Sequence, residues 1–344
     1  MDFITLTSDD EVTETTKVTT GYFTGDLGSL AGSNFSTESL AAGEKKYYYD
    51  LQYSSEDQFS VAFGHINGLG SQSGSTANKV GQTEAVYRQF ASQLLLPSEI
   101  SGGFIINSTS QSACHFIVAK RARMKDRINK KNWTLQLSGS TSAHPTSASV
   151  LHLTDDSDVS GSEATPVGPR FNIVSGSTGT ILAASSSKHY GHFYPNMGIL
   201  VLSTTQLSSS IPGHDVVTNN ITLATMASGS GFTIDTSTDA QNALKMVKAM
   251  QLGTQTFRSE EDQTSKMYFC RAKAGNFNYT NNPTFTSGSD NGFSQLSMEG
   301  NPQTFITTIG LYDASDALVA VGKLSTPVQK NRSSEAVIKA KLTF

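Results

Sequence analysis

Two histidines three residues apart, His189 and His192, are the residues in this sequence best suited to bind a metal ion. A protein metal site usually needs a third and a fourth ligand, and no residue at a recognisable spacing supplies them. Gly191 also weakens any helical presentation of the pair. The pattern therefore favours packing at the end of a strand, and it predicts neither a metal nor a cofactor.

An acidic stretch resembles the first half of a calcium-binding loop. Asp156 and Asp158 alternate with small residues, and Gly161 follows where such a loop turns sharply. The twelfth position, which would offer a bidentate Glu, is Val167. The stretch therefore favours an acidic hairpin turn over a cation site.

Several glycine-rich stretches match part of a catalytic loop motif, but none of them matches a complete motif. Gly322 and Lys323 end like a phosphate-binding loop, but the earlier glycine is missing and Leu324 stands where Ser or Thr is needed. Residues 70–74 place Gln72 at the position of a serine nucleophile. With no catalytic constellation, the sequence predicts a protein that is not an enzyme.

Residues 120–131, here called the basic segment, form the largest charge anomaly. With Asp126 as the one acid, the segment carries 7 − 1 = +6, so the rest of the chain carries −4 − 6 = −10. Such a segment could bind nucleic-acid phosphates, but it lacks the interleaved aromatic residues of single-strand binders. It favours a solvated connector or a patch that contacts an acidic neighbouring subunit. The candidate contacts are Lys120, Arg121, Arg123, Lys125, Arg127, Lys130 and Lys131.

The composition describes a polar, nearly neutral chain. Of 344 residues, 47 are Ser and 38 are Thr, the hydrophobic fraction is 37%, the charged fraction is 16% and the net charge is −4. This balance argues against a helical bundle, while 11 Tyr and 18 Phe argue against disorder. No apolar run approaches the roughly 18 residues of a membrane span, and the first residues show no secretory signal. Cys114 and Cys270 leave one disulfide open.

Alternating patterns predict a mainly β fold of sandwich-like antiparallel sheets with long loops. Two short helices are expected near residues 83–96, capped by Thr83, and near residues 238–252, capped by Thr238 and ended by Gly253. The clearest strand patterns are residues 13–20, 47–53, 59–63, 114–119, 133–137, 198–203 and 268–272.

Serine and glycine stretches near residues 138–148 and 204–213 are the expected breaks in the chain. Residues 64–81 form a further segment of this kind, which we expect to be flexible in the free chain. The predicted parts, which are also compatible with one structural unit, are an N-terminal β-rich region with one helix (1–137), a central β region (138–210) and a C-terminal β-rich region with one helix and a terminal hairpin (211–344).

Residues 305–323 predict a β-hairpin in which two alternating strands are joined by a polar turn. Ile309, Leu311 and Tyr312 on its first strand are candidate assembly contacts. The hairpin resembles a signature of phage tail-fibre attachment domains and baseplate proteins. The residues that carry this resemblance are 307–313 and 318–324.

Further stretches resemble a structural protein family of the large contractile-tailed (myovirus) cyanophages. The likeness covers most of the chain, and the shared order of the stretches is its stronger signal. Fibre attachment domains place the hairpin ahead of a long shaft, whereas here one alternating strand, residues 337–344, follows it; this favours a compact baseplate subunit. The stretches are residues 13–23, 59–65, 121–125, 132–135 and 190–199.

The resemblance implies a non-enzymatic virion protein of the phage tail, a baseplate wedge or fibre adaptor, assembled in the cytoplasm of the bacterial host. Its expected partners are other tail and baseplate proteins and further copies of itself, bound through edge strands and arms; nucleic acid and membrane are not expected. Two alternatives stay open. One is a head or neck structural protein, and the other is a receptor- or glycan-binding module that uses the tyrosines of residues 47–53 or 190–194.

Overall fold

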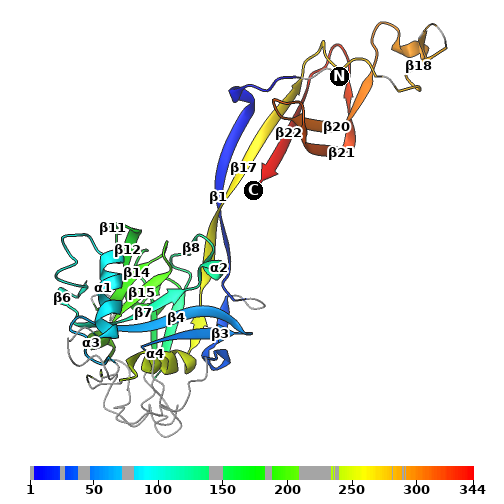
Figure 1. Ribbon diagram of the computed structural model, residues 1–344. Helices are drawn as coiled ribbons and strands as arrows, with labels where there is room; N and C mark the ends of the chain where they lie inside the picture. Colours follow the sequence, from blue (N-terminus) through cyan, green and yellow to red (C-terminus); the bar gives the residue numbers. More distant parts are fainter. Residues whose placement is uncertain are drawn as a thin grey trace. The chain divides into compact units, whose positions relative to one another are not determined.

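The computed structural model of the chain divides into two units (Figure 1). Unit 1 combines Met1–Lys17 with Asp262–Phe344, and unit 2 is Val18–Glu261. The expected breaks near residues 138–148 and 204–213 both fall inside unit 2, so the units do not coincide with the three regions expected from composition. The structure describes residues 4–23, 28–37, 47–71, 81–138, 150–182, 188–208, 234, 236, 240–280, 282–288, 290 and 292–344.

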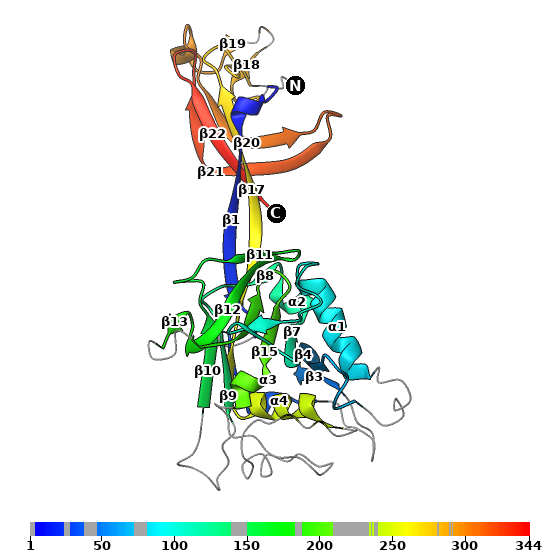
Figure 2. The ribbon, with the colours of Figure 1, turned by 90° about the vertical axis from the view of Figure 1, so that its left-hand side faces the viewer.

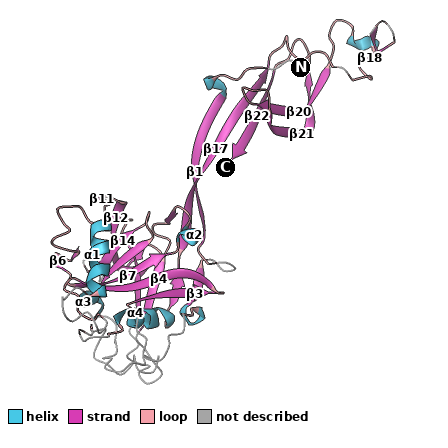
Figure 3. Cartoon of the chain, in the orientation of Figure 1, coloured by secondary structure: helices cyan, strands magenta, loops and turns pink. Residues whose placement is uncertain are grey.

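Strands make up about half of the described chain and far exceed the helices, which confirms the mainly β class (Figure 3). Strands β1 (Glu11–Gly21) and β17 (Arg258–Ala272) contain residues of both units. The other elements of unit 2 are β2 (Ser29–Ala31), η2 (Gly32–Asn34), β3 (Tyr48–Tyr53), β4 (Glu56–His65), α1 (Gln82–Leu94), β5 (Ile105–Ile106), β6 (Thr109–Ser110), β7 (Ala113–Ala119), α2 (Arg121–Met124), β8 (Arg127–Ile128), β9 (Thr134–Ser138), β10 (Val150–Asp155), β11 (Glu163–Thr165), β12 (Gly168–Ser177), β13 (Thr180–Ile181), β14 (His189–Tyr194), β15 (Ile199–Ser203), α3 (Thr204–Ser208), α4 (Asn242–Gln251) and β16 (Thr254–Thr256).

The main sheet of unit 2 curls until its two ends meet. Its strands follow the order β2-β16-β9-β10-β12-β14-β15-β7-β4-β3 and pair antiparallel. Ser36, just beyond β2, forms a bridge with Gln52 of β3 through backbone N–H···O distances of 2.9 and 2.8 Å. The bridge links the segment that follows the first strand of this path to its last strand, so the two ends of the path lie next to each other at this point.

Strand β7 shows that this sheet is buried on both faces. Ala113 and Ile117 belong to an inner core, to which nearly every strand of the path contributes, whereas Cys114 and Phe116 belong to an outer core beneath α1. Burial on both faces favours a continuous apolar run, which residues 113–119 provide. The large aromatic residues of the inner core include Tyr22, Phe59, Trp133, Phe193 and Phe257.

The two longer helices of the described chain lie where the sequence predicts them (Figure 2). Helix α1 packs on β4 and buries Tyr87, Ala91 and Leu94. Helix α4 lies across β3, β4 and β9 and adds Met246 and Val247 to the inner core. The buried residues of α1 recur every three or four positions, which is the pattern of an amphipathic helix, whereas α4 is buried on nearly all sides.

The expected N-cap of the first helix is wrong. Helix α1 begins at Gln82 with Gly81 in the N-cap position. The Thr83 hydroxyl is buried and donates to the Leu69 carbonyl oxygen at 2.9 Å, so it holds the preceding loop and does not cap the helix. Thr238, residues 72–80 of the expected flexible segment and most of the two Ser/Gly breaks lie outside the described residues.

Unit 1 is built from strands with little core of its own. Its sheet has the order β1-β17-β22, and β20 with β21 forms a separate two-stranded sheet, which confirms the expected hairpin. Buried Lys330 ends β21 and donates to the carbonyl oxygens of Ala274 (3.0 Å) and Asn331 (2.8 Å) and to Asn278 Oδ1 (3.0 Å). The other elements of unit 1 are η1 (Ser8–Asp10), β18 (Thr286–Ser287), β19 (Gly292–Phe293), η5 (Leu296–Met298), β20 (Thr304–Tyr312), β21 (Leu318–Lys330) and β22 (Ala336–Thr343).

Both cysteines are free thiols. Cys114 is buried in β7, and Cys270 is half-buried in β17. Burial raises the pKa of the Cys114 thiol far above its ordinary value, so this thiol is unreactive.

Candidate assembly surfaces

The basic segment is anchored to unit 2 by apolar side chains at its centre. Met124 of α2 and Ile128 of β8 are buried in the inner core. Met124 packs against the turn between β14 and β15, where a Cβ on Gly198 would lie 2.2 Å from its sulfur. Gly198 also has a φ of +64°, so glycine suits this position both for space and for backbone conformation. The segment is therefore a fixed part of the unit, and its charged side chains project from a defined backbone.

Five of the seven basic side chains form ion pairs with carboxylates of the same unit. Two acidic pairs, Glu56–Asp57 and Glu260–Glu261, supply four of the partners. Counting Asp126 and the five acidic partners, the cluster carries 7 − 6 = +1. The ion pairs are Lys120–Asp57 (3.1 Å), Arg123–Glu56, Lys125–Glu261 (2.7 Å), Arg127–Glu260 (3.1 Å) and Lys131–Asp158 (2.6 Å).

The remaining two basic residues also have partners inside unit 2. Arg121 Nη1 donates to the carbonyl oxygens of Asp126 at 3.0 Å and Asn196 at 3.1 Å. The Lys130 ammonium lies 5.0 Å from the centre of the Phe171 ring, a cation–π distance. The strong positive charge expected from the local sequence is thus largely neutralised within the chain. Contact of this segment with another subunit stays a prediction.

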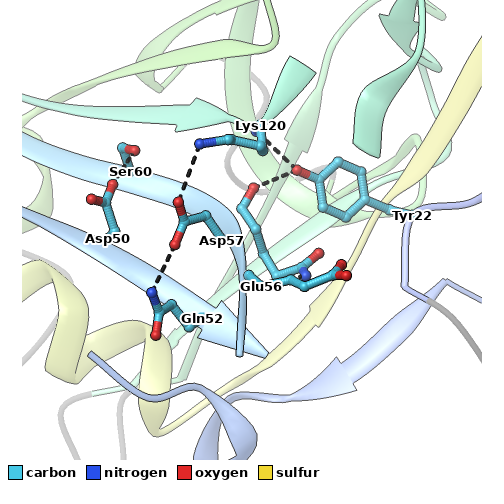
Figure 4. Close-up of polar contacts among 8 residues, drawn as sticks. Tyr22, Asp50, Gln52, Glu56, Asp57, Ser60 and Lys120 are labelled. Atoms are coloured by element: carbon cyan, nitrogen blue, oxygen red, sulfur yellow. Dashed lines mark hydrogen bonds and ion pairs between the residues drawn. The ribbon is translucent and has the colours of Figure 1, made fainter. Parts of the chain in front are cut away.

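Asp57 links two strands to the start of the basic segment (Figure 4). It accepts hydrogen bonds from Gln52 Nε2 at 2.9 Å and from Lys120 Nζ at 3.1 Å, and these bonds lower the pKa of its carboxyl group. On the other side of Lys120, the Tyr22 hydroxyl accepts the Lys120 backbone N–H at 3.1 Å and donates to the Gln58 carbonyl oxygen. Burial raises the pKa of Tyr22, which keeps its hydroxyl neutral as a donor.

The least exposed ion pair joins β8 to the beginning of β17. Glu260 is 9% exposed and pairs through Oε1 with Arg127 Nε, while its Oε2 accepts from Asn129 Nδ2 at 2.6 Å. Asn129 Nδ2 also donates to the Thr19 hydroxyl at 2.9 Å. A half-buried pair with several hydrogen bonds is costly to break on one side, so this network fixes the register of β8 on β17.

The other predicted contacts lie in unit 1, on the hairpin β20–β21. Ile309 and Leu311 are half-buried, and Tyr312 is exposed. Sequence reasoning missed their neighbours, of which Val319 and Val321 are 64% and 59% exposed. The missed signal is the apolar pattern of β21 itself, which continues on both faces of the hairpin.

Exposed apolar side chains gather in unit 1. Of the nineteen large hydrophobic residues exposed in the described chain, twelve belong to this unit, although it has fewer residues than unit 2. Among the described residues of unit 1, the buried hydrophobic ones are Ala272, Phe285 and Ala336. The twelve exposed residues are Ile4, Val12, Phe277, Tyr279, Leu296, Phe305, Tyr312, Leu318, Val319, Val321, Val337 and Phe344.

The acidic candidate metal ligands make structural contacts within unit 2. Asp156 accepts from the Asn172 backbone N–H and from Asn172 Nδ2, both at 2.9 Å, and Asp158 pairs with Lys131. His192 is buried in β14, where burial lowers its pKa to about 3. Within the described ranges, no three His, Cys, Asp or Glu side chains are grouped to hold a metal ion.

The tyrosines considered for sugar stacking are mostly part of the core. Tyr49, Tyr190 and Tyr194 are buried, while Tyr48 is exposed. Among the residues that the structure describes, no helix is long and apolar enough to cross a membrane.

Comparison with known proteins gives no match at any level. No family model matches the chain, and neither a curated protein nor a solved structure is detectably similar to it.

Proposed function

We propose that this protein is a non-enzymatic structural subunit of a contractile phage tail, a baseplate wedge or fibre-adaptor component that acts through protein–protein assembly. The observation that supports the proposal is the exposed apolar surface of unit 1. The hairpin β20–β21 is a two-stranded sheet with apolar side chains on both faces. Such a hairpin is marginally stable alone in water and gains stability when a neighbour covers it.

The placement in a phage tail is supported by the sequence resemblance of the hairpin and of the stretches spread along the chain. The structure adds a reason for a subunit to have two different units. The main sheet of unit 2 has a filled core, and unit 1 offers open strands and apolar side chains. The first suits a scaffold, and the second suits a contact with other subunits.

Imaging of labelled particles tests the proposal. A copy of the chain with an affinity tag would be introduced into the phage that encodes it, and purified particles would be labelled and viewed by electron microscopy. Label at the distal end of the tail is the expected result. Label on the head or neck would contradict the tail placement, and particles without label and without the chain by mass spectrometry would overturn the structural role.

A further inference from the structure

The sheet of unit 1 has two open edges that carry opposite charges. In the described chain, β1 and β22 each pair along unit 1 with β17 alone. Residues 8–17, at and before β1, contain four acids and one lysine, a net charge of −4 + 1 = −3. Strand β22 contains Lys339 and Lys341 and no acid. We call β1 the acidic edge and β22 the basic edge.

The open side of the basic edge can be assigned from its hydrogen bonds. The N–H and C=O of Phe344 both bond to Thr264 of β17, at 3.0 and 3.2 Å. In an antiparallel ladder, alternate residues direct these groups to opposite sides. Val337, Lys339, Lys341 and Thr343 therefore direct their N–H and C=O groups away from β17, toward the open edge.

The acidic edge has charges available for a partner. Glu11 pairs with Lys266 at 2.6 Å, while Asp9 and Glu14 are exposed. Thr16 contacts Gln263 and Glu11 contacts Lys266, so β1 runs antiparallel to β17. Strand β22 also runs antiparallel to β17, and the two edges are therefore parallel to each other.

One face of the same sheet combines half-buried apolar side chains with the Glu11–Lys266 ion pair, because Lys266 lies two positions from Tyr268 on the same strand. Tyr268 pairs with Ala340, and Cys270 pairs with Ile338, and all four side chains are half-buried. The opposite face carries Lys339 and Lys341 next to Met267 and Phe269 of β17. Joining such sheets edge to edge would pair the N–H and C=O groups that β1 and β22 leave open.

We infer that the basic edge of one copy pairs with the acidic edge of a second copy, in a head-to-tail contact that closes into a ring. Charge selects this arrangement over its alternatives, because two basic edges or two acidic edges would place like charges opposite each other. In a cyclic ring every copy presents its strands in the same direction, which matches the parallel course of β1 and β22. This inference deepens the assembly role proposed above and rests on it.

A proline on the open side of β22 provides the first test. Lys341→Pro removes an outward N–H and leaves the ladder to β17 in place, whereas Lys341→Ala, the matched control, removes the side chain alone. Light scattering of the full chain should give a mass of two or more chains of 36.7 kDa each, and Lys341→Pro should weaken association about tenfold or more. Lys341→Ala should weaken it less. Unchanged circular dichroism would show that the variant is folded.

Charge reversal tests the head-to-tail pairing. One variant carries Asp9→Lys with Glu14→Lys, and the other carries Lys339→Glu with Lys341→Glu. Each alone should associate more weakly than the natural chain, and an equimolar mixture should recover association in hetero-oligomers that contain both variants equally. The inference would be overturned if the natural chain is monomeric at all concentrations. It would also be overturned if association is unchanged by these charge reversals and by Lys341→Pro. Neither result bears on the position of the chain in a particle, which imaging tests separately.

Discussion

Unit 2 and unit 1 are both built from antiparallel strands, but they differ in how far the edges and faces of their sheets are covered. In unit 2 the main sheet is joined end to end by the Ser36–Gln52 bridge, and apolar side chains fill both of its faces. In unit 1 the strands keep open edges, and twelve large hydrophobic residues face water. The difference teaches that β content alone says little about independent stability, which depends on whether edges and faces are covered.

Removal of the central aromatic residue of unit 2 should have the largest effect. Trp133 is buried and stacks on Phe257, with ring centres 5.6 Å apart. Trp133→Ala should lower the free energy of unfolding by about 3–5 kcal/mol through lost burial and the cavity left behind. Urea unfolding followed by circular dichroism measures this loss. Tryptophan fluorescence cannot follow the variant, because Trp133 is the one tryptophan of the chain.

The matched control in unit 1 is Phe305→Ala, which removes a side chain that is 58% exposed. It should change the free energy of unfolding by no more than about 0.5 kcal/mol. If it destabilises the chain as much as Trp133→Ala does, unit 1 has a core of its own and the comparison fails.

Mild acid should destabilise unit 2 through its buried histidines. Burial lowers the pKa of His115 to about 3, with Lys245 adding to the effect, and lowers that of His192 to about 3, with Arg170 and His189 adding to it. The unfolded chain binds protons near pH 6.5, so it takes up more protons than the folded chain as the pH falls. Stability is therefore complete above about pH 6.5 and falls toward pH 3.

At pH 5 each of these histidines should lower the free energy of unfolding by about 2 kcal/mol relative to pH 8. His65, whose pKa is also lowered by burial, acts in the same direction. Urea unfolding at pH 8 and pH 5 measures the loss, and His192→Gln should reduce the difference between the two values. An equal difference in the variant would show that His192 is not the source.

Loss of the Glu260 carboxylate should lower the free energy of unfolding more than loss of a carboxylate in an exposed ion pair. Glu260→Gln leaves the Arg127 guanidinium without its carboxylate and should lower the free energy of unfolding by about 1.5–3 kcal/mol. Asp158→Asn breaks the more exposed pair with Lys131 and should cost less than about 1 kcal/mol. Chemical unfolding of both variants makes the comparison, and similar losses would contradict the ranking by burial.

Polar substitutions on the hairpin should have the smallest effect on stability and a clear effect on association. Val319→Ser with Val321→Ser changes two residues that are exposed in the free chain, so unfolding should shift by no more than about 0.5 kcal/mol. Association measured by light scattering should weaken, because a partner would bury these side chains. Association equal to that of the natural chain would place the contact elsewhere.

Local patterns were sufficient to predict several of the strands and the two longer helices, but not β10 or β12. The alternation of residues 47–53 and 59–63 corresponds to β3 and β4, and the turn between them uses Ser54 and Ser55 at positive φ. The hairpin near the end of the chain was predicted in the same way, from two alternating strands and a polar turn. These features depend on residues that are neighbours in the sequence.

Features that depend on distant residues were not predicted. Arg127 and Glu260 meet across more than a hundred residues, so a local charge count shows the basic side chain without its partner. The boundary between the units crosses β1 and β17 in the middle of continuous strand patterns, where composition does not change. The bridge between Ser36 and Gln52 is likewise not predicted by any local sequence pattern.

The assignment of both chain ends to unit 1 has a consequence for the timing of synthesis. Strand β1 leaves the ribosome early, but its partner residues in β17 follow only after all of Val18–Glu261 has been made. At about 5–20 residues per second, these 244 residues correspond to a delay of about 12–50 s. Unit 2 can complete its sheet during that time. The pairing of β1 with β17 in unit 1 can therefore form only after the residues of unit 2 have been synthesised.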